Sequence, residues 1–288
     1  TLRERVAFYA KIVQYLRDIN ASVGNKLPDG LMSMYSRDED CFSIAHYACM
    51  IMRSFGMPVV VDHVAGYREL AGRHYFCSVY NTASKTWQGF NPEGSLPGDR
   101  DFLGAPTLNI YRDMFEVQKD APCFVRNKGE FVPGHLASPC IRDVTEKYCP
   151  VMQITLQFNL YTDNNLAYLA AFNCRGEEGL VASTWGVIDK DKRCVTFKRV
   201  LPNTLFLPVC YKGEECVSFG KPFYVKQING KPHICYLPVK DGQTSKSNVL
   251  LLRKFPVKQN MRLLADHLKG SVILGSNDKT FEKADTLL

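Results

Sequence analysis

The sequence contains no Cys-x-x-Cys pair and no two histidines at metal-ligand spacing, although it has 11 cysteines and 6 histidines. Zinc sites commonly take their ligands from such short repeats. We therefore predict no metal site, and we predict no cofactor. An isolated thiol inside an apolar segment behaves as a small hydrophobic residue, the role that we assign to Cys149, Cys174, Cys194 and Cys235. Cys210 and Cys216 flank a turn and could form a disulfide across a hairpin.

Long hydrophobic runs are also missing, since none approaches the roughly 20 residues that a membrane-spanning helix needs. The formal net charge of +7 is spread along the chain, and the densest basic patch, residues 190–193, is interrupted by an aspartate. A nucleic-acid-binding protein would gather its basic residues on one face among aromatic side chains. These absences exclude a membrane-spanning helix and argue against nucleic acid as a partner. The composition is that of a globular protein.

The first third of the chain predicts two helices and a β-hairpin. Apolar residues recur at helical spacing near the N-terminus, at Val6, Tyr9, Ala10, Val13 and Leu16. This helix is expected to end before Asn20. A second helix is expected to begin with Asp40 as its N-cap and to end at Gly56, before a buried strand. Residues 74–80 and 86–90 predict two strands joined by a turn.

The character of the sequence changes after residue 143, where short β-rich segments alternate with turns. These segments are residues 152–160, 167–173, 180–188, 194–200, 205–211, 222–225, 233–237 and 248–253. About eight such strands without helical periodicity predict an antiparallel β-sandwich. We therefore predict an α+β fold with a mixed core domain over residues 1–139 and a β-sandwich over 140–256. Residues 257–288 are predicted to form a C-terminal tail, with a helix over 259–269.

Cys41 is the candidate nucleophile. It stands in the first turn of the predicted second helix, where unpaired backbone N–H groups and the helix dipole favour an anion. This position favours the thiolate, which is the nucleophilic form of cysteine. The alternative is that Cys41 is a small apolar residue packed at a helix start.

The predicted hairpin brings His74 and Asn91 together. If Tyr80 pairs with Trp87 across the turn, the alternation of side chains places His74 and Asn91 on one face as diagonal neighbours. An asparagine beside a histidine holds the imidazole in one tautomer, as the third residue of Cys-His-Asn catalysis does. A register slip of one residue would separate them. Taken singly, His74 could be a strand-edge histidine bonded to backbone, and Asn91 a turn residue before Pro92.

Three segments in this order resemble the transglutaminase-like superfamily. Asp40-Cys-Phe-Ser-Ile-Ala, continued by Arg53-Ser-Phe-Gly-Met-Pro-Val, is similar to the helix that carries the family's nucleophile. His74-Tyr-Phe resembles the family's His-x-aromatic strand, and Trp87-Gln-Gly-Phe-Asn-Pro resembles its Trp-x-x-apolar-Asp-Pro segment. The ordered set covers roughly the first third of the chain. The resemblance implies a papain-like, transglutaminase-like cysteine domain over residues 1–139.

The order of features most resembles secreted transglutaminase-like proteins of Bacteroidetes. This resemblance implies a secreted, periplasmic or cell-surface location, and it implies that the tail begins a further module. Three positions depart from the family pattern. Asp40 stands where a glycine is usual, Phe76 stands where the family has tryptophan, and Asn91 occupies the position of the acid.

The resemblance implies an enzyme whose cysteine nucleophile attacks an amide. Cys41 would attack the carbonyl, His74 would act as general base and then acid, and Asn91 would orient His74. The expected substrate is a protein, peptide or glycopeptide, and no Ca²⁺-binding loop is visible that would favour crosslinking over hydrolysis. We expect a monomer. The alternative is a catalytically degenerate module that binds a glycan or a cell-surface protein.

Asp62, Tyr75 and Trp87 are predicted to line the substrate cleft. Asp62 lies near the end of a predicted strand, and it is the alternative candidate for the acid that orients His74. Tyr75 and Trp87 would serve equally well as core residues. His46 follows Cys41 by five residues on the predicted helix, so we expect its side chain to point elsewhere.

Overall fold

The computed structural model describes residues 1–23, 41–68, 72–99, 102–172, 179–237, 274–275 and 285–286. The chain divides into two compact units, Thr1–Val239 and Lys240–Leu288. In the second unit, β14 (Leu274–Gly275) pairs with β15 (Asp285–Thr286). The strand predicted over 248–253 and the helix predicted over 259–269 lie outside the described residues. Within those that are described, no helix is both long and apolar enough to cross a membrane.

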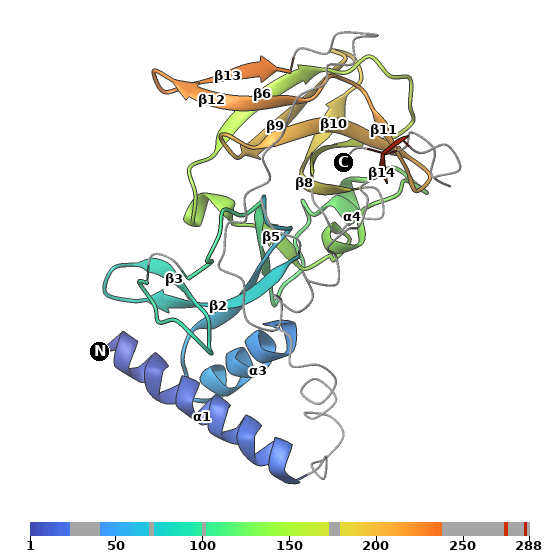
Figure 1. Ribbon diagram of the computed structural model, residues 1–288. Helices are drawn as coiled ribbons and strands as arrows, with labels where there is room; N and C mark the ends of the chain where they lie inside the picture. Colours follow the sequence, from blue (N-terminus) through green and yellow to red (C-terminus); the bar gives the residue numbers. More distant parts are fainter. Residues whose placement is uncertain are drawn as a thin grey trace. The chain divides into compact units, whose positions relative to one another are not determined.

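In the described part of the chain, two helices precede the first sheet (Figure 1). α1 spans Leu2–Val23 and α3 spans Cys41–Ser54. α1 continues past Asn20, because a single asparagine lowers helix propensity only slightly. α3 ends before Gly56, whose φ of 75° is one that glycine adopts without steric cost. The second predicted helix is therefore confirmed, while its proposed N-cap, Asp40, lies outside the described residues. Shorter helical turns are α4 (Pro122–Val125), η1 (Gly134–Leu136) and η2 (Thr145–Lys147).

The smaller sheet has five antiparallel strands in the order β3-β2-β1-β4-β5. Tyr80 pairs with Trp87 as the sequence predicted, and β3 ends directly before Asn91. The hairpin and its register are thus confirmed. The strands are β1 (Val59–Val64), β2 (His74–Asn81), β3 (Thr86–Phe90), β4 (Ile110–Asp113) and β5 (Ile141–Asp143).

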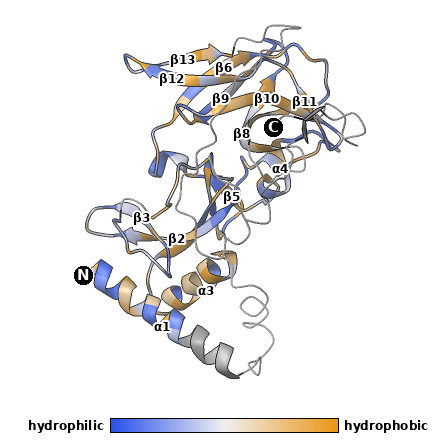
Figure 2. Cartoon of the chain, in the orientation of Figure 1, coloured by the Kyte–Doolittle hydropathy of each residue, from blue (hydrophilic) through white to orange (hydrophobic). Residues whose placement is uncertain are grey.

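Each face of this sheet carries its own hydrophobic layer. On one face α3 buries Ala45, Ala48 and Met52 against side chains of the sheet, and α1 adds Val6 and Val13 to the same cluster. α3 is mostly hydrophobic in Figure 2, whereas α1 mixes hydrophobic and hydrophilic residues. The opposite face buries Val64, Phe76, Ile110 and Val144. The first of these clusters holds α3, and with it Cys41, against the sheet.

The larger sheet has eight strands in the order β13-β12-β10-β7-β8-β9-β6, with β11 paired to β10. The antiparallel, strand-rich character of this region is confirmed. Instead of two separate sheets, one continuous sheet forms, because β8 pairs with both β7 and β9. β13 and β6, at the two ends of the order, approach each other, so the sheet curls around the main hydrophobic core. The strands are β6 (Met152–Gln157), β7 (Leu166–Phe172), β8 (Leu180–Asp189), β9 (Cys194–Val200), β10 (Leu205–Lys212), β11 (Glu215–Ser218), β12 (Phe223–Ile228) and β13 (Lys231–Tyr236).

Buried hydrogen bonds join the two sheets within the first unit. The Ser183 hydroxyl donates to the Asn109 side-chain oxygen (2.8 Å), and the Tyr111 hydroxyl donates to the Ser183 carbonyl (2.8 Å). The Asn109 amide also donates to the Arg199 carbonyl (2.8 Å). The predicted boundary between residues 139 and 140 falls inside this unit, just before β5. The two sheets are therefore tied together by satisfied buried polar groups as well as by apolar packing.

The possible disulfide between Cys210 and Cys216 is not formed. Cys210 pairs with Val217, and Cys216 pairs with Tyr211, so the two thiols extend from opposite faces of the hairpin. No disulfide joins any two of the ten described cysteines.

Gly186 is a position where the packing of the larger sheet can be tested. A Cβ atom there would lie 2.5 Å from the Thr196 carbonyl oxygen, which belongs to the backbone of β9 and cannot rotate away. We expect Gly186→Ala to lower the free energy of unfolding by about 1–3 kcal/mol, the usual cost of overpacking. Gly94→Ala is the matched control, since its Cβ would meet no atom within 4 Å. Urea denaturation checks both variants, and equal stabilities would contradict the close approach of β8 and β9.

Candidate functional site

Cys41 lies at the point where α3 begins and β2 begins. It is the first residue of α3, and its sulfur accepts a hydrogen bond from the backbone N–H of Tyr75 (3.4 Å). A donor directed at sulfur favours the charged thiolate over the neutral thiol. This contact joins the helix dipole in stabilising an anion at the same atom. The sequence motif does not reveal the Tyr75 N–H, because a backbone donor has no residue signature.

His74 and Asn91 are in direct contact. His74 Nε2 and Asn91 Oδ1 lie 2.7 Å apart, and the Asn91 amide nitrogen donates to the Phe102 carbonyl at 2.5 Å. A carbonyl can only accept, so the amide of Asn91 must present its oxygen to His74. His74 then carries its proton on Nε2, which leaves Nδ1 free to exchange a proton with Cys41. The predicted proximity of His74 and Asn91 is confirmed.

The surroundings of His74 favour its protonated form. Burial by itself lowers the pKa of His74, because a charged imidazolium loses solvation. Hydrogen bonds with Cys41 and Asn91, together with the negative charge available at Cys41, outweigh burial and bring the pKa above its ordinary value. His74 is therefore placed to accept a proton from the thiol near neutral pH.

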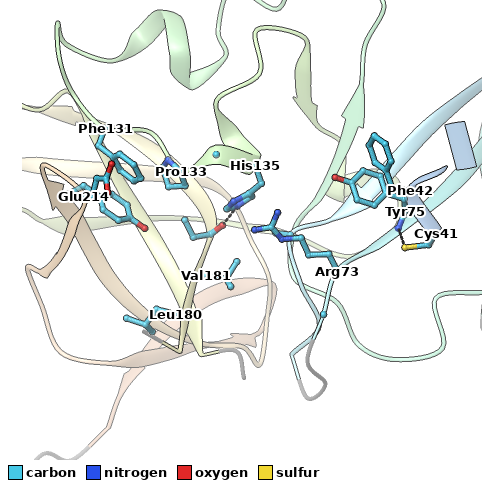
Figure 3. A pocket seen from close by; sticks show the side chains of 15 residues that line it. Cys41, Phe42, Arg73, Tyr75, Phe131, Pro133, His135, Leu180, Val181 and Glu214 are labelled. Carbon is cyan, nitrogen blue, oxygen red and sulfur yellow. Dashed lines mark hydrogen bonds between the residues drawn. The ribbon is translucent and has the colours of Figure 1, made fainter. Parts of the chain in front are cut away.

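Cys41 opens into a cavity of about 590 Å³ inside the first unit (Figure 3). Phe42 and Tyr75 form the wall beside Cys41, and Arg73 extends into the space between them and His135. The larger sheet and the loop before it supply the opposite wall, with Phe131, Pro133, Leu180, Val181, Tyr211 and Glu214. The cavity therefore has apolar walls, a few polar side chains and one nucleophilic sulfur, a composition typical of ligand sites.

His135 contributes a neutral polar group to this cavity. Its Nε2–H donates to the Ala182 carbonyl (2.8 Å), so η1 is linked to β8. Burial lowers the pKa of His135 to about 4, more than the hydrogen bond to the carbonyl raises it. His135 is consequently uncharged at neutral pH.

Asp62 occupies a different environment from the one expected of an orienting acid. It is fully buried and accepts two hydrogen bonds from Arg112, at 2.7 and 2.8 Å. The Tyr148 hydroxyl also donates to Asp62, and it hydrogen-bonds to the Ser78 hydroxyl (2.9 Å). Asp62 and Arg112 are register partners of β1 and β4. Asp62 is thus engaged in a buried ion pair, and its carboxylate is directed to Arg112 and not to His74.

Tyr75 and Trp87 lie on different cavities. Tyr75 lines the cavity of Cys41, packs edge-on against Phe42 and stacks on His63 at 4.9 Å. Trp87 lies under the Arg112 guanidinium, which is 4.1 Å from the ring centroid, and it lines a separate cavity of about 500 Å³. Tyr75 is therefore the member of the pair that a substrate at Cys41 would meet.

The other histidines near Cys41 do not point at its sulfur. His46 Nδ1 lies 2.8 Å from the Phe42 carbonyl, and its Nε2 lies 3.4 Å from Asp113. His63 is buried under Tyr75, and burial lowers its pKa. Across the described part of the chain, no group of three or more His, Cys, Asp or Glu side chains could hold a metal ion.

Arg73 and His135 are site residues that sequence analysis missed. His135 is distant in sequence from the Cys41, His74 and Asn91 motifs, and only the tertiary fold brings it to the cavity. Arg73 is adjacent to His74, and this adjacency is the one signal that could have identified it.

Comparisons with protein-family models, with curated proteins and with solved structures find no match for this chain. The functional inference therefore rests on the geometry of the site.

His135 predicts a specific pH dependence of stability. Between its ordinary pKa near 6.5 and its folded pKa of about 4, the unfolded chain binds a proton at His135 that the folded protein does not. Protons therefore favour unfolding in this window, and the stability present above pH 6.5 is lost as the pH falls. His135→Gln keeps an N–H donor for the Ala182 carbonyl but does not titrate.

Between pH 7 and pH 4, we expect the unfolding free energy of wild type to fall by up to about 3 kcal/mol more than that of His135→Gln. Denaturant unfolding at the two pH values measures it. A difference that does not change with pH would mean that His135 is as protonated in the folded state as in the unfolded one.

Proposed function

We propose that this protein is a cysteine-nucleophile amide hydrolase or acyltransferase of the transglutaminase-like type, with Cys41, His74 and Asn91 as its catalytic set. The observation that carries the proposal is the connected arrangement of the three side chains. Asn91 Oδ1 fixes the Nε2–H tautomer of His74 at 2.7 Å, and the free Nδ1 is then available to Cys41. A nucleophile next to a base, with the base oriented by a third group, is the arrangement that activates a weak nucleophile.

The proposed reaction begins with transfer of the thiol proton from Cys41 to His74 Nδ1. The thiolate attacks the amide carbonyl, a C–S bond forms, and the electron pair of the C=O bond moves to oxygen. The C–N bond then breaks as the His74 imidazolium donates its proton to the departing amine, which leaves a thioester on Cys41. Water or an acceptor amine attacks the thioester with His74 again as base, and the Cys41 thiol is released. The backbone N–H of Cys41, at the helix start, would stabilise the oxyanion.

A papain-like core is supported by the order and placement of the elements. The candidate nucleophile opens a helix that packs on an antiparallel sheet, and the histidine opens a strand of the sheet. The asparagine directly follows the adjacent strand. The same order underlies the resemblance to the transglutaminase-like superfamily noted in the sequence.

The substrate is proposed to be an amide of a protein, peptide or glycopeptide. The 590 Å³ cavity could contain a few residues of an extended chain, and Tyr75 and Tyr211 offer aromatic contacts on opposite walls. A secreted, periplasmic or cell-surface location and a monomeric state accompany this proposal.

A catalytically degenerate binding module is the second candidate, because a second cavity has a lining of different composition from the cavity at Cys41. Both of its tryptophans, Trp87 and Trp185, line the cavity of about 500 Å³, along with charged side chains such as Arg199 and Asp120. Aromatic rings beside charged hydrogen-bonding groups suit a glycan or a protein surface. This candidate requires no reactive thiol, so the reactivity of Cys41 discriminates between the two.

The labelling rate of Cys41 by iodoacetamide tests the enzymatic proposal. At pH 7 we expect Cys41 to react at least about tenfold faster than the partly exposed Cys194 and Cys235, because His74 can accept its proton and the Tyr75 N–H is directed at its sulfur. In His74→Ala the rate at Cys41 should fall by roughly tenfold or more. Quantitative mass spectrometry of each cysteine measures both effects.

His233→Ala is the matched control for this labelling, since His233 is exposed on β13 and distant in sequence from Cys41. Its Cys41 rate should equal that of wild type. A Cys41 that reacts no faster than Cys194 and Cys235, or that is indifferent to the loss of His74, would rule out an activated thiolate and favour the binding module.

Asn91 predicts opposite effects for two substitutions on the pKa of His74. The hydrogen bond from His74 to Asn91 raises this pKa, so Asn91→Ala should lower it. Asn91→Asp should raise it above the wild-type value, because a carboxylate attracts the imidazolium. The chemical shift of the His74 imidazole proton against pH, assigned with His74→Ala, measures both. A pKa unchanged by both substitutions would show that Asn91 does not orient His74 in solution.

A further inference from the structure

The cavity of Cys41 contains a cation that the proposed mechanism leaves unused. Arg73 directly precedes His74, is exposed, and lines the cavity. Among the side chains that the structure describes, none forms an ion pair or a hydrogen bond with its guanidinium. In Figure 3 Arg73 extends from the Cys41 side of the cavity toward His135. An arginine in this position keeps its hydrogen-bond donors available for a ligand.

The charged groups on opposite walls of the cavity differ in sign. Burial lowers the pKa of His135 to about 4, so His135 adds no positive charge at neutral pH. Glu214, in the turn between β10 and β11, lines the same cavity near Phe131. A ligand that spans the cavity would therefore meet a positive group close to the nucleophile and a negative group on the opposite wall.

We propose that Arg73 binds a carboxylate, and that the amide attacked by Cys41 carries this carboxylate close to its reacting carbonyl. The proposal rests on the proposed cysteine chemistry and adds its substrate class, an acidic peptide. Guanidinium groups bind carboxylates through two parallel N–H···O bonds, which hold the ligand in a defined orientation. The carboxylate would be either an acidic side chain next to the reacting amide or the free C-terminus of the peptide.

Arg73 is close in sequence to the residue that contacts Cys41, so its side chain can reach a ligand bound at the sulfur. Tyr75 N–H contacts the Cys41 sulfur, and Arg73 precedes Tyr75 by two residues, about 7 Å of extended chain. The arginine side chain is long enough to bridge this gap when it turns from the direction of His135 toward Cys41. A carboxylate held there would lie within a few bonds of a carbonyl at Cys41. The carboxylate would act through orientation, and Arg73 would be a specificity residue and not a catalytic one.

Two small alkylating agents of similar size test the proposal without knowledge of the natural substrate. Iodoacetate carries a carboxylate and iodoacetamide does not. Each forms an S–CH₂ bond with Cys41 and releases iodide. We measure the ratio of their rates at Cys41 by mass spectrometry in wild type, Arg73→Gln and Arg73→Lys. His74 is present in all three proteins, so its attraction for an anion cancels in the comparison.

We expect the iodoacetate-to-iodoacetamide ratio to fall roughly fivefold in Arg73→Gln, the effect of losing an exposed ion pair. Arg73→Lys should retain part of the preference for iodoacetate, because lysine keeps the positive charge but lacks the bidentate donor geometry of the guanidinium. The wild-type ratio should fall as salt is raised to about 0.5 M. Arg142→Gln removes another exposed arginine, which belongs to β5, and its ratio should equal that of wild type.

The outcomes separate this proposal from the one it rests on. If Cys41 is no more reactive than the other cysteines with either agent, the cysteine chemistry itself fails. If Cys41 is activated but Arg73→Gln leaves the ratio unchanged, the carboxylate site is overturned while the cysteine chemistry stands.

Three short peptides then distinguish the two sources of the carboxylate by their protection of Cys41 from iodoacetamide. Acetyl-Ala-Glu-Ala-amide offers only a side-chain carboxylate, acetyl-Ala-Gln-Ala offers only a C-terminal one, and acetyl-Ala-Gln-Ala-amide offers neither. Stronger protection by the first assigns a side chain, and stronger protection by the second assigns a C-terminus. Equal protection by all three would contradict recognition of a carboxylate.

Discussion

The pairing of β2 with β1 on one side and with β3 on the other is the constraint on which the fold and the candidate site both depend. β2 begins at His74, and its next residue, Tyr75, directs a backbone N–H to the sulfur of Cys41. The pairing with β3 ends just before Asn91, so the amide of Asn91 arrives at the imidazole of His74. A slip of one residue would turn every side chain of β3 to the other face and would separate Asn91 from His74. The register therefore determines whether the three side chains can act as one set.

A buried ion pair fixes the register of the neighbouring strands β1 and β4. Asp62 and Arg112 face each other across β1 and β4, and Tyr148 adds a further donor to Asp62. Each charge taken alone would be costly to bury, and only their mutual pairing makes burial tolerable. Any shift of β1 against β4 would break this pair. The Asp62 carboxylate is thus engaged in the sheet, and Asn91 is the side chain in contact with His74.

Local patterns in the sequence predict much of this fold, and long-range contacts account for what they miss. α3 was predictable from its apolar stripe and from Gly56, and the β2–β3 hairpin was predictable from alternation and its turn. β4 and β5 are four and three residues long, and their segments lie among prolines and glycines, so they have too few residues for a visible period. Sequence patterns do not show cross-sheet bonds such as Ser183 to Asn109, which cross the boundary predicted between residues 139 and 140. The same reason hid His135, which reaches the cavity only through tertiary packing.

The neutral third residue and the free arginine have a joint consequence for the proposed site. With Asp in place of Asn91, the thiolate, the imidazolium and the carboxylate would sum to one negative charge, which would repel an anionic substrate. With Asn91 the sum is zero, and Arg73 adds a positive charge on the Cys41 side of the cavity. Asn91 stabilises the imidazolium less than a carboxylate would, so His74 is the weaker base. The Tyr75 N–H and the positive end of α3 compensate in part, because both favour the thiolate without help from His74. These charges are the reason that we propose an acidic amide as the substrate, which the usual Cys-His-Asp arrangement would repel.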